Sequence, residues 1–134
     1  MDVIESTAAS DRRARASRLA RLAAPVGLMA IIWLLSDQEQ VGPDLGAWAR
    51  VATSAVHFAE FAVLFALWRW ALGRRRAPIA AAIALAWAVL DEVHQSWVPG
   101  RDADPIDVLV DAAGIAAAWW LLALRDRRVA GREG

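Results

Sequence analysis

Acidic, histidine and amide side chains interrupt three apolar stretches of this chain, and these are the residue types that move protons or hold polar ligands. The candidates for proton transfer are His57, Glu60, Asp91, His94 and Asp107. The candidates for binding a polar ligand are Gln38, Gln95, Arg101, Asp104 and Asp111. Carboxylates and imidazoles in a partly dry site suit acid–base chemistry, and an arginine holds a phosphate or carboxylate through two parallel hydrogen bonds. The chain has no Cys, which excludes thiolate nucleophiles and disulfides.

The spacing of these residues predicts that they share helical faces. Residues three or four positions apart lie on the same side of a helix. The sets with this spacing are His57 with Glu60, Asp91 with His94 and Gln95, and Asp107 with Asp111. Glu92 projects roughly 100° away from Asp91, so we expect it to point elsewhere.

The elements that must position these residues are membrane spans. The chain is 58% hydrophobic with a mean hydropathy of +0.34, above the apolar share of about 45–50% typical of soluble domains. We predict an all-α integral membrane bundle of four transmembrane helices over residues 20–36, 51–73, 77–97 and 105–124. The first span is interpreted as an uncleaved signal anchor. Residues 1–20 are expected to be a loose tail, residues 21–128 the membrane domain, and residues 129–134 a second tail.

Local signals mark where the fourth span begins. Asp104 followed by Pro105 is typical of a helix N-cap with proline at the first helical position. A purely capping role is therefore an alternative to ligand binding for Asp104. Gly114 is interpreted as a residue that permits close packing between helices.

The arginines predict the orientation. Twelve of the 15 basic residues, all Arg, lie in the N-terminal tail, in the loop 74–76 or in the C-terminal tail. Cytoplasmic segments carry such an excess, so both termini are predicted to be cytoplasmic, in a bacterial cell membrane. Trp33 and Trp97 are expected to anchor the outer interface. The expected inner anchors are Trp68, Trp70, Trp119 and Trp120.

Counting outward from the cytoplasmic arginines places the polar residues at similar depths. Glu60, Asp91 and Asp111 lie 14 or 15 residues out, at about 21–23 Å. The second layer is His57, His94 and Asp107, at about 26–27 Å. Because ionised side chains are costly in lipid, we expect both layers to face the bundle interior or a water-filled vestibule at the extracytoplasmic face.

The motifs in this order resemble the VanZ-like family of small bacterial membrane proteins. The resemblance rests on Ser36-Asp37-Gln38, on the run His57 to Phe61, on Asp91-Glu92-Val93-His94-Gln95 and Val98-Pro99-Gly100-Arg101, and on the spaced Asp104, Asp107, Asp111 and Gly114. The chain departs from the family pattern at Asp37, where Ser is frequent, and at Asp111, where Asn is frequent. The resemblance implies a role in the cell envelope, connected with tolerance of glycopeptide antibiotics such as teicoplanin.

Several functions fit this site. One is a binding protein for an envelope component, such as a lipid-linked or peptidoglycan precursor. Another is an enzyme acting on such a substrate by acid–base chemistry, or with a metal held by His57, Glu60, Asp91 and His94. A small transporter and a purely structural polar network are further alternatives. We expect no cofactor, no resident metal and no nucleic-acid partner, whereas membrane lipids are expected partners and a homo-oligomer stays open.

Overall fold

The computed structural model describes residues 2–37, 46–100 and 104–132, and all the regular secondary structure in these ranges is helical. The elements are α1 (Asp2–Ser36), α2 (Ala47–Leu72), the short 3-10 helix η1 (Arg74–Arg76), α3 (Ala77–Gln95) and α4 (Pro105–Ala130). Four stretches are long and apolar enough to cross a membrane: Leu19–Ser36, Arg50–Leu72, Arg74–Gln95 and Pro105–Ala130. The prediction of an all-helical fold with four candidate spans is confirmed.

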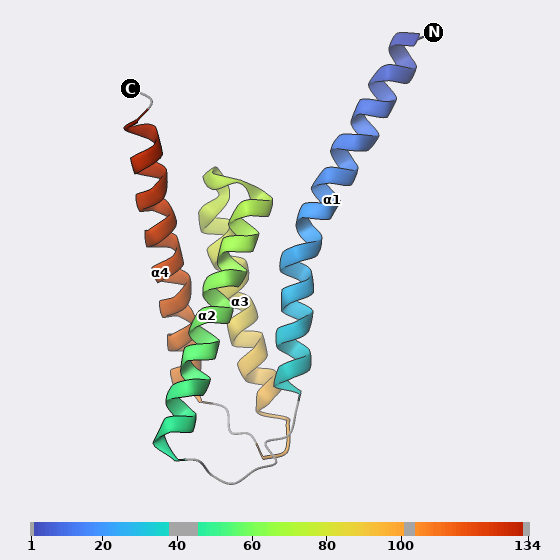
Figure 1. The fold of residues 1–134 in the computed structure, drawn as a ribbon. Helices are drawn as coiled ribbons and strands as arrows, with labels where there is room; N and C mark the ends of the chain where they lie inside the picture. Colours follow the sequence, from blue (N-terminus) through green and yellow to red (C-terminus); the bar gives the residue numbers. More distant parts are fainter. Residues whose placement is uncertain (1, 38–45, 101–103, 133–134) are drawn as a thin grey trace.

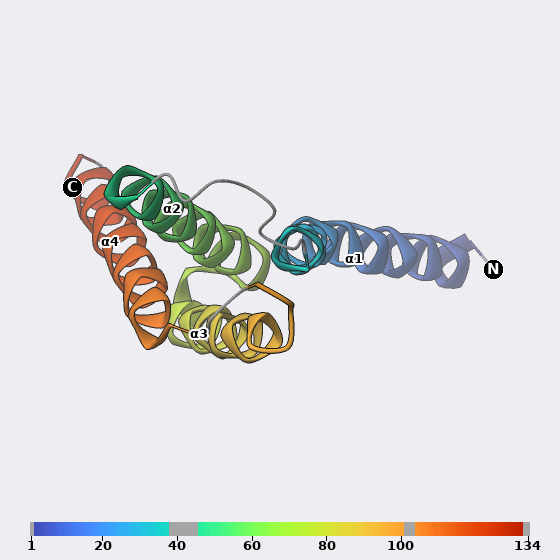
Figure 2. The ribbon, with the colours of Figure 1, turned by 90° about the horizontal axis from the view of Figure 1, so that it is seen from below.

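The helices alternate in direction, which gives the bundle two different ends (Figure 1). We call the end where α1 and α3 finish and α2 and α4 begin the loop end. The opposite end, with η1 and the C-terminal part of α4, is the arginine end. Seen along the bundle, α2, α3 and α4 form one cluster, and α1 lies beside α2 and α3 (Figure 2). The chain direction therefore gathers the predicted site residues at the loop end.

Helix α1 extends much further than its apolar span. Residues 2–20, expected to be a loose tail, are its N-terminal part, and this part leans away from the other helices (Figure 1). The segment 2–24 contains no Gly and no Pro and is rich in Ala and Arg, which are strong helix formers. Local propensity therefore continues the helix beyond its packed part.

Large side chains from α2 and small ones from α3 form the core. Phe61, Leu64 and Phe65 are completely buried, and α3 faces the core with alanines at four-residue intervals: Ala80, Ala84 and Ala88. Small residues let membrane helices approach closely. Trp68, expected as an interface anchor, is instead part of this core, with 9% of its surface exposed. Its position one turn after Leu64 places it on the buried face of α2.

A glycine sets the approach of α4 to α2. A Cβ atom on Gly114 would collide with the backbone carbonyl of Phe58, so only glycine fits at this crossing. The interpretation of Gly114 as a packing residue is confirmed. His57 directly precedes Phe58 and Asp111 lies one turn before Gly114, so this contact also brings those two side chains within reach of each other.

Candidate functional site

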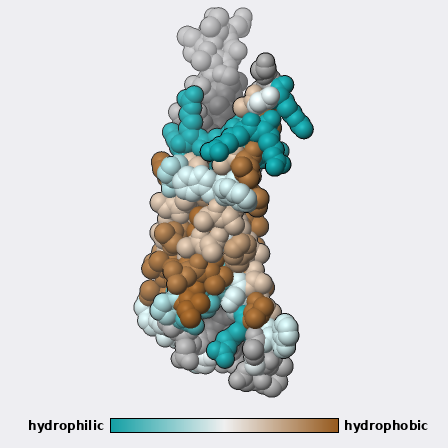
Figure 3. Space-filling view, turned by 90° about the vertical axis from the view of Figure 1, so that its left-hand side faces the viewer, coloured by the Kyte–Doolittle hydropathy of each residue, from teal (hydrophilic) through white to brown (hydrophobic). Residues whose placement is uncertain are grey.

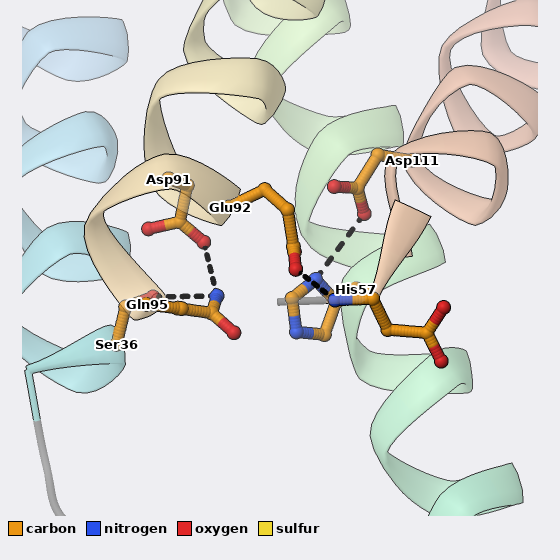
Figure 4. Close-up of polar contacts among 7 residues, drawn as sticks. Ser36, His57, Asp91, Glu92, Gln95 and Asp111 are labelled. Carbon is orange, nitrogen blue, oxygen red and sulfur yellow. Dashed lines mark hydrogen bonds and ion pairs between the residues drawn. The ribbon is translucent and has the colours of Figure 1, made fainter. Parts of the chain in front are cut away.

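His57 of α2 and Asp111 of α4 form a buried pair at the loop end. Their side chains bring His57 Nδ1 and Asp111 Oδ1 to 3.3 Å, with 7% of His57 and 2% of Asp111 exposed (Figure 4). The distance is that of an ion pair, but the angles are not those of a hydrogen bond. The contact joins the two predicted depth layers. It also places the imidazole beside a carboxylate that can stabilise its protonated form.

A second polar contact joins α3 to the end of α1. Gln95 Nε2 donates to Asp91 Oδ2 at 2.7 Å and lies 3.4 Å from Ser36 Oγ (Figure 4). Asp91 is only 1% exposed, and its other oxygen, Oδ1, has no hydrogen-bond partner among the described residues. Asp91 and Gln95, predicted to share a face of α3, therefore bind each other within that helix. The contact of Gln95 with Ser36 joins this face of α3 to α1.

Glu92 points away from Asp91 and toward the start of α4. Its Oε1 accepts a hydrogen bond from the backbone N–H of Asp104. The side chain of Asp104 in turn accepts from the backbone N–H of Ile106 at 2.9 Å, which is an N-cap contact. The predicted helix start at Asp104 and Pro105 is confirmed. In this structure Asp104 fixes a helix end, and Glu92 fixes that end to α3.

His94 is held by α1 and not by its neighbours on α3. Its ring stacks on Trp33 with centroids 3.8 Å apart and an interplanar angle of 14°. Its Nε2 lies 3.4 Å from Asp37 Oδ1. Trp33, expected to anchor the membrane interface, also packs against Trp87, with the two ring centroids 5.6 Å apart. Helical spacing places His94 on the same face of α3 as Asp91. The His94 ring nevertheless contacts Trp33 and Asp37 at the C-terminal end of α1.

A cleft of about 280 Å³ lies between α1 and α2 and reaches this polar site. Its lining residues are Ile32, Leu35, Ser36, Ala52, Thr53, Val56, His57 and Glu60. Glu60 is partly buried and lies within electrostatic range of His57, Asp91 and Asp111. Because Nδ1 of His57 is turned to Asp111, Nε2 is the ring nitrogen that can meet a molecule in the cleft. The cleft therefore joins an apolar wall to an imidazole and a carboxylate.

Asp107 is partly buried and lies within electrostatic range of His57 and Glu92. His57 is thus surrounded by carboxylates from two helices, namely Glu60, Asp107 and Asp111. Two other predicted binding residues, Gln38 and Arg101, lie outside the described residues.

The described side chains do not form a metal site. Among residues 2–37, 46–100 and 104–132, no three His, Asp or Glu side chains are placed to hold one ion. Asp91 is occupied by Gln95 and His94 by the end of α1, so the four ligands considered for a metal-assisted reaction do not converge.

Four residues of the site are not among the candidates that the sequence predicts: Trp33, Ser36, Asp37 and Glu92. Ser36 and Asp37 belong to the Ser36-Asp37-Gln38 motif that carries the family resemblance, so the motif was a usable signal for them. Glu92 is a carboxylate inside an apolar span, and such a residue requires a partner. The role of Trp33 depends on how α1 meets α3, which no pattern within either helix contains.

Comparison with known proteins identifies the family of this chain. No curated protein and no solved structure matches it. A family model described as VanZ/LLP1 matches residues 6–126, which include α2 and α3, most of α1 and α4, and every residue of the site. The match agrees with the resemblance carried by the motifs at the ends of the spans. The chain therefore belongs to the VanZ/LLP1 family.

Proposed function

We propose that this protein is a multi-pass protein of the bacterial cell membrane that binds the polar head of a lipid-linked envelope component at its loop end. The distribution of arginines supports cytoplasmic termini and an extracytoplasmic loop end. Membership of the VanZ/LLP1 family supports an envelope role and a contribution to glycopeptide tolerance, with teicoplanin as the antibiotic to test.

The observation that carries this proposal is the composition of the cleft between α1 and α2. Its apolar lining includes Ile32, Leu35 and Val56, and its polar lining includes His57 and Glu60. Leu35 and Val56 are also exposed on the outer surface of the bundle, where lipid would surround them. A molecule with an acyl or prenyl chain and a polar head matches this surface, because its chain stays in lipid while its head reaches the polar groups.

One observation favours a second candidate, an enzyme that acts on the same class of molecule. An imidazole beside a buried carboxylate is the usual arrangement of a general base, and His57 has Asp111 in this position. Glu60 supplies a second group for proton transfer on the wall of the same cleft. In this alternative, His57 Nε2 takes a proton from a hydroxyl or water in the cleft.

The binding function is tested by expressing the protein in a glycopeptide-sensitive host and measuring tolerance of teicoplanin. Glu60→Gln removes the charge from the cleft wall at nearly constant shape, and we expect tolerance to fall while membrane abundance is unchanged. Glu5→Gln makes the same chemical change in α1 at the arginine end and should behave as wild type. Equal tolerance for Glu60→Gln and wild type would contradict a role for the cleft.

The enzyme and the binding protein differ in what they leave behind. Mass spectrometry of lipid-linked precursors from cells with and without the protein separates them. A chemically altered precursor that disappears in a His57→Gln variant of normal abundance indicates catalysis. A precursor pool with unchanged chemistry indicates binding alone.

The orientation can be tested directly because the natural chain has no Cys. Single cysteines introduced as Ser96→Cys and Arg75→Cys place a thiol at the exposed surface of the loop end and the arginine end. We expect a membrane-impermeant thiol reagent added to intact cells to label only Ser96→Cys. Labelling of Arg75→Cys alone would reverse the proposed orientation.

A further inference from the structure

A second hollow lies on α4 at the arginine end, far from the polar site. This groove, of about 390 Å³, is lined by Leu121, Leu124, Arg125, Arg128, Val129 and Arg132. The outer surface on the α4 side carries an apolar belt in its middle and hydrophilic residues at the arginine end (Figure 3). The lining residues of the groove span the border between these two regions.

Two arginines of the groove, Arg125 and Arg128, share one face of α4, and the third, Arg132, lies in the turn that follows the helix. Arg125, Arg128 and Arg132 follow at three- and four-residue steps, so their guanidinium groups can converge. All three are exposed, and Leu121 precedes them by one turn on the same face. Along the groove, the apolar side chain of Leu121 is therefore followed, toward the C-terminus, by three positively charged side chains.

The acid on this part of α4 does not neutralise the groove. Asp126 is paired with Arg69 of α2 and with Arg74 of η1, the latter at 2.9 Å between Nε and Oδ2. It is thus directed to the α2 side of the helix. Within the described residues, no ion pair is recorded for Arg125, Arg128 or Arg132.

We propose that this groove binds the phosphate of an anionic phospholipid, with an acyl chain along Leu121 and Leu124. Guanidinium groups bind phosphate oxygens through charged hydrogen bonds, and a basic pocket at a membrane surface favours anionic over zwitterionic lipids. The apolar lower part of the groove selects a lipid over free phosphate, because only a lipid fills both parts. This site does not depend on the function proposed for the loop end.

Native mass spectrometry of the purified full chain, mixed with equimolar phosphatidylglycerol and phosphatidylcholine, tests the proposal. We expect wild type to retain phosphatidylglycerol in preference to phosphatidylcholine. The variant Arg125→Gln/Arg128→Gln/Arg132→Gln should lose this preference by about fivefold or more, since one basic residue near a membrane surface contributes about that factor. Arg128→Gln alone, the central change, gives a milder variant should the triple variant fail to fold.

The matched control removes the same number of charges outside the groove, as Arg75→Gln/Arg76→Gln/Arg127→Gln. We expect this control to keep the preference of wild type. An equal loss in both triple variants would show that diffuse positive charge attracts the lipid, and would overturn the site. Equal retention of phosphatidylglycerol and phosphatidylcholine by wild type would overturn the assignment to an anionic phospholipid, whereas a preference for phosphatidylglycerol supports it.

Discussion

The two ends of the bundle carry charged residues in opposite ways. At the loop end, buried polar side chains from different helices meet in pairs, as in His57 with Asp111 and Gln95 with Ser36. At the arginine end, most charged side chains are exposed, and the carboxylate of Asp126 forms ion pairs with Arg69 and Arg74. Buried polar groups need partners, whereas exposed arginines are satisfied by water and lipid headgroups. The loop end therefore depends on the exact fit of helices, and the arginine end depends mainly on charge.

The largest effect is expected from Gly114→Ala, whose Cβ atom forces α4 away from the backbone of Phe58. We expect a loss of about 3 kcal/mol in the free energy of unfolding, as for overpacking of a tight contact. Denaturation in mixed micelles measures it. Gly27→Ala is the matched control, because a Cβ atom there meets nothing within 4 Å. Equal stability of the two variants would contradict the close crossing at the loop end.

A double-mutant cycle on His57→Phe and Asp111→Leu measures the pair itself. We expect a coupling free energy of about 2 kcal/mol, because contacting buried charges are not additive. The same cycle with Asp107→Asn in place of Asp111→Leu should give a smaller value, since Asp107 is less buried. A coupling free energy near zero for His57 and Asp111 would contradict the claim that the loop end is stabilised by paired buried side chains.

At the arginine end, Asp126→Asn is expected to lower the free energy of unfolding by about 1.5 kcal/mol, which is the contribution of a hydrogen bond to a charged group. Arg69→Gln should destabilise more than Arg74→Gln, because the Arg69 side chain is 12% exposed and that of Arg74 is 62% exposed. Thermal unfolding of the three variants checks the order. A larger loss for Arg74→Gln would show that the exposed contact dominates.

The smallest effect concerns the start of α4. Asp104→Ala removes the side-chain cap on Ile106 and should cost about 1 kcal/mol. Asp104→Asn keeps a capping oxygen and should stay close to wild type in the same unfolding measurement. If both variants unfold alike, the backbone contact to Glu92 is sufficient to hold this helix end.

The sequence predicted what depends on single helices. Hydropathy located the four spans, and the Asp104-Pro105 pair located a helix start, because both signals are local. The N-terminal part of α1 is helical although its polar composition predicts a loose tail, because its Ala and Arg residues have high helix propensity. The family was recognisable because its motifs are clustered at the ends of the spans.

Partnerships between helices were not predictable from spacing. Helical periodicity assigns His57 and Asp111 to faces, but it does not give the rotation and offset of α2 against α4. The same limit explains why His94 was grouped with Asp91, although its ring contacts Trp33. It also explains Trp68, whose residue type suits an interface but whose side of α2 is buried.

The contact between α2 and α4 also has a consequence for how the chain is made. Membrane proteins are synthesised from the N-terminus, so His57 emerges from the ribosome well before Asp111. Until residues 104–111 follow, Glu92 lacks the backbone N–H of Asp104, and His57 lacks the carboxylate of Asp111. Polar side chains without partners are costly in lipid. Insertion of α4 is therefore the step that brings Asp111 to His57, and a chain truncated before Pro105 lacks this partner of the buried imidazole.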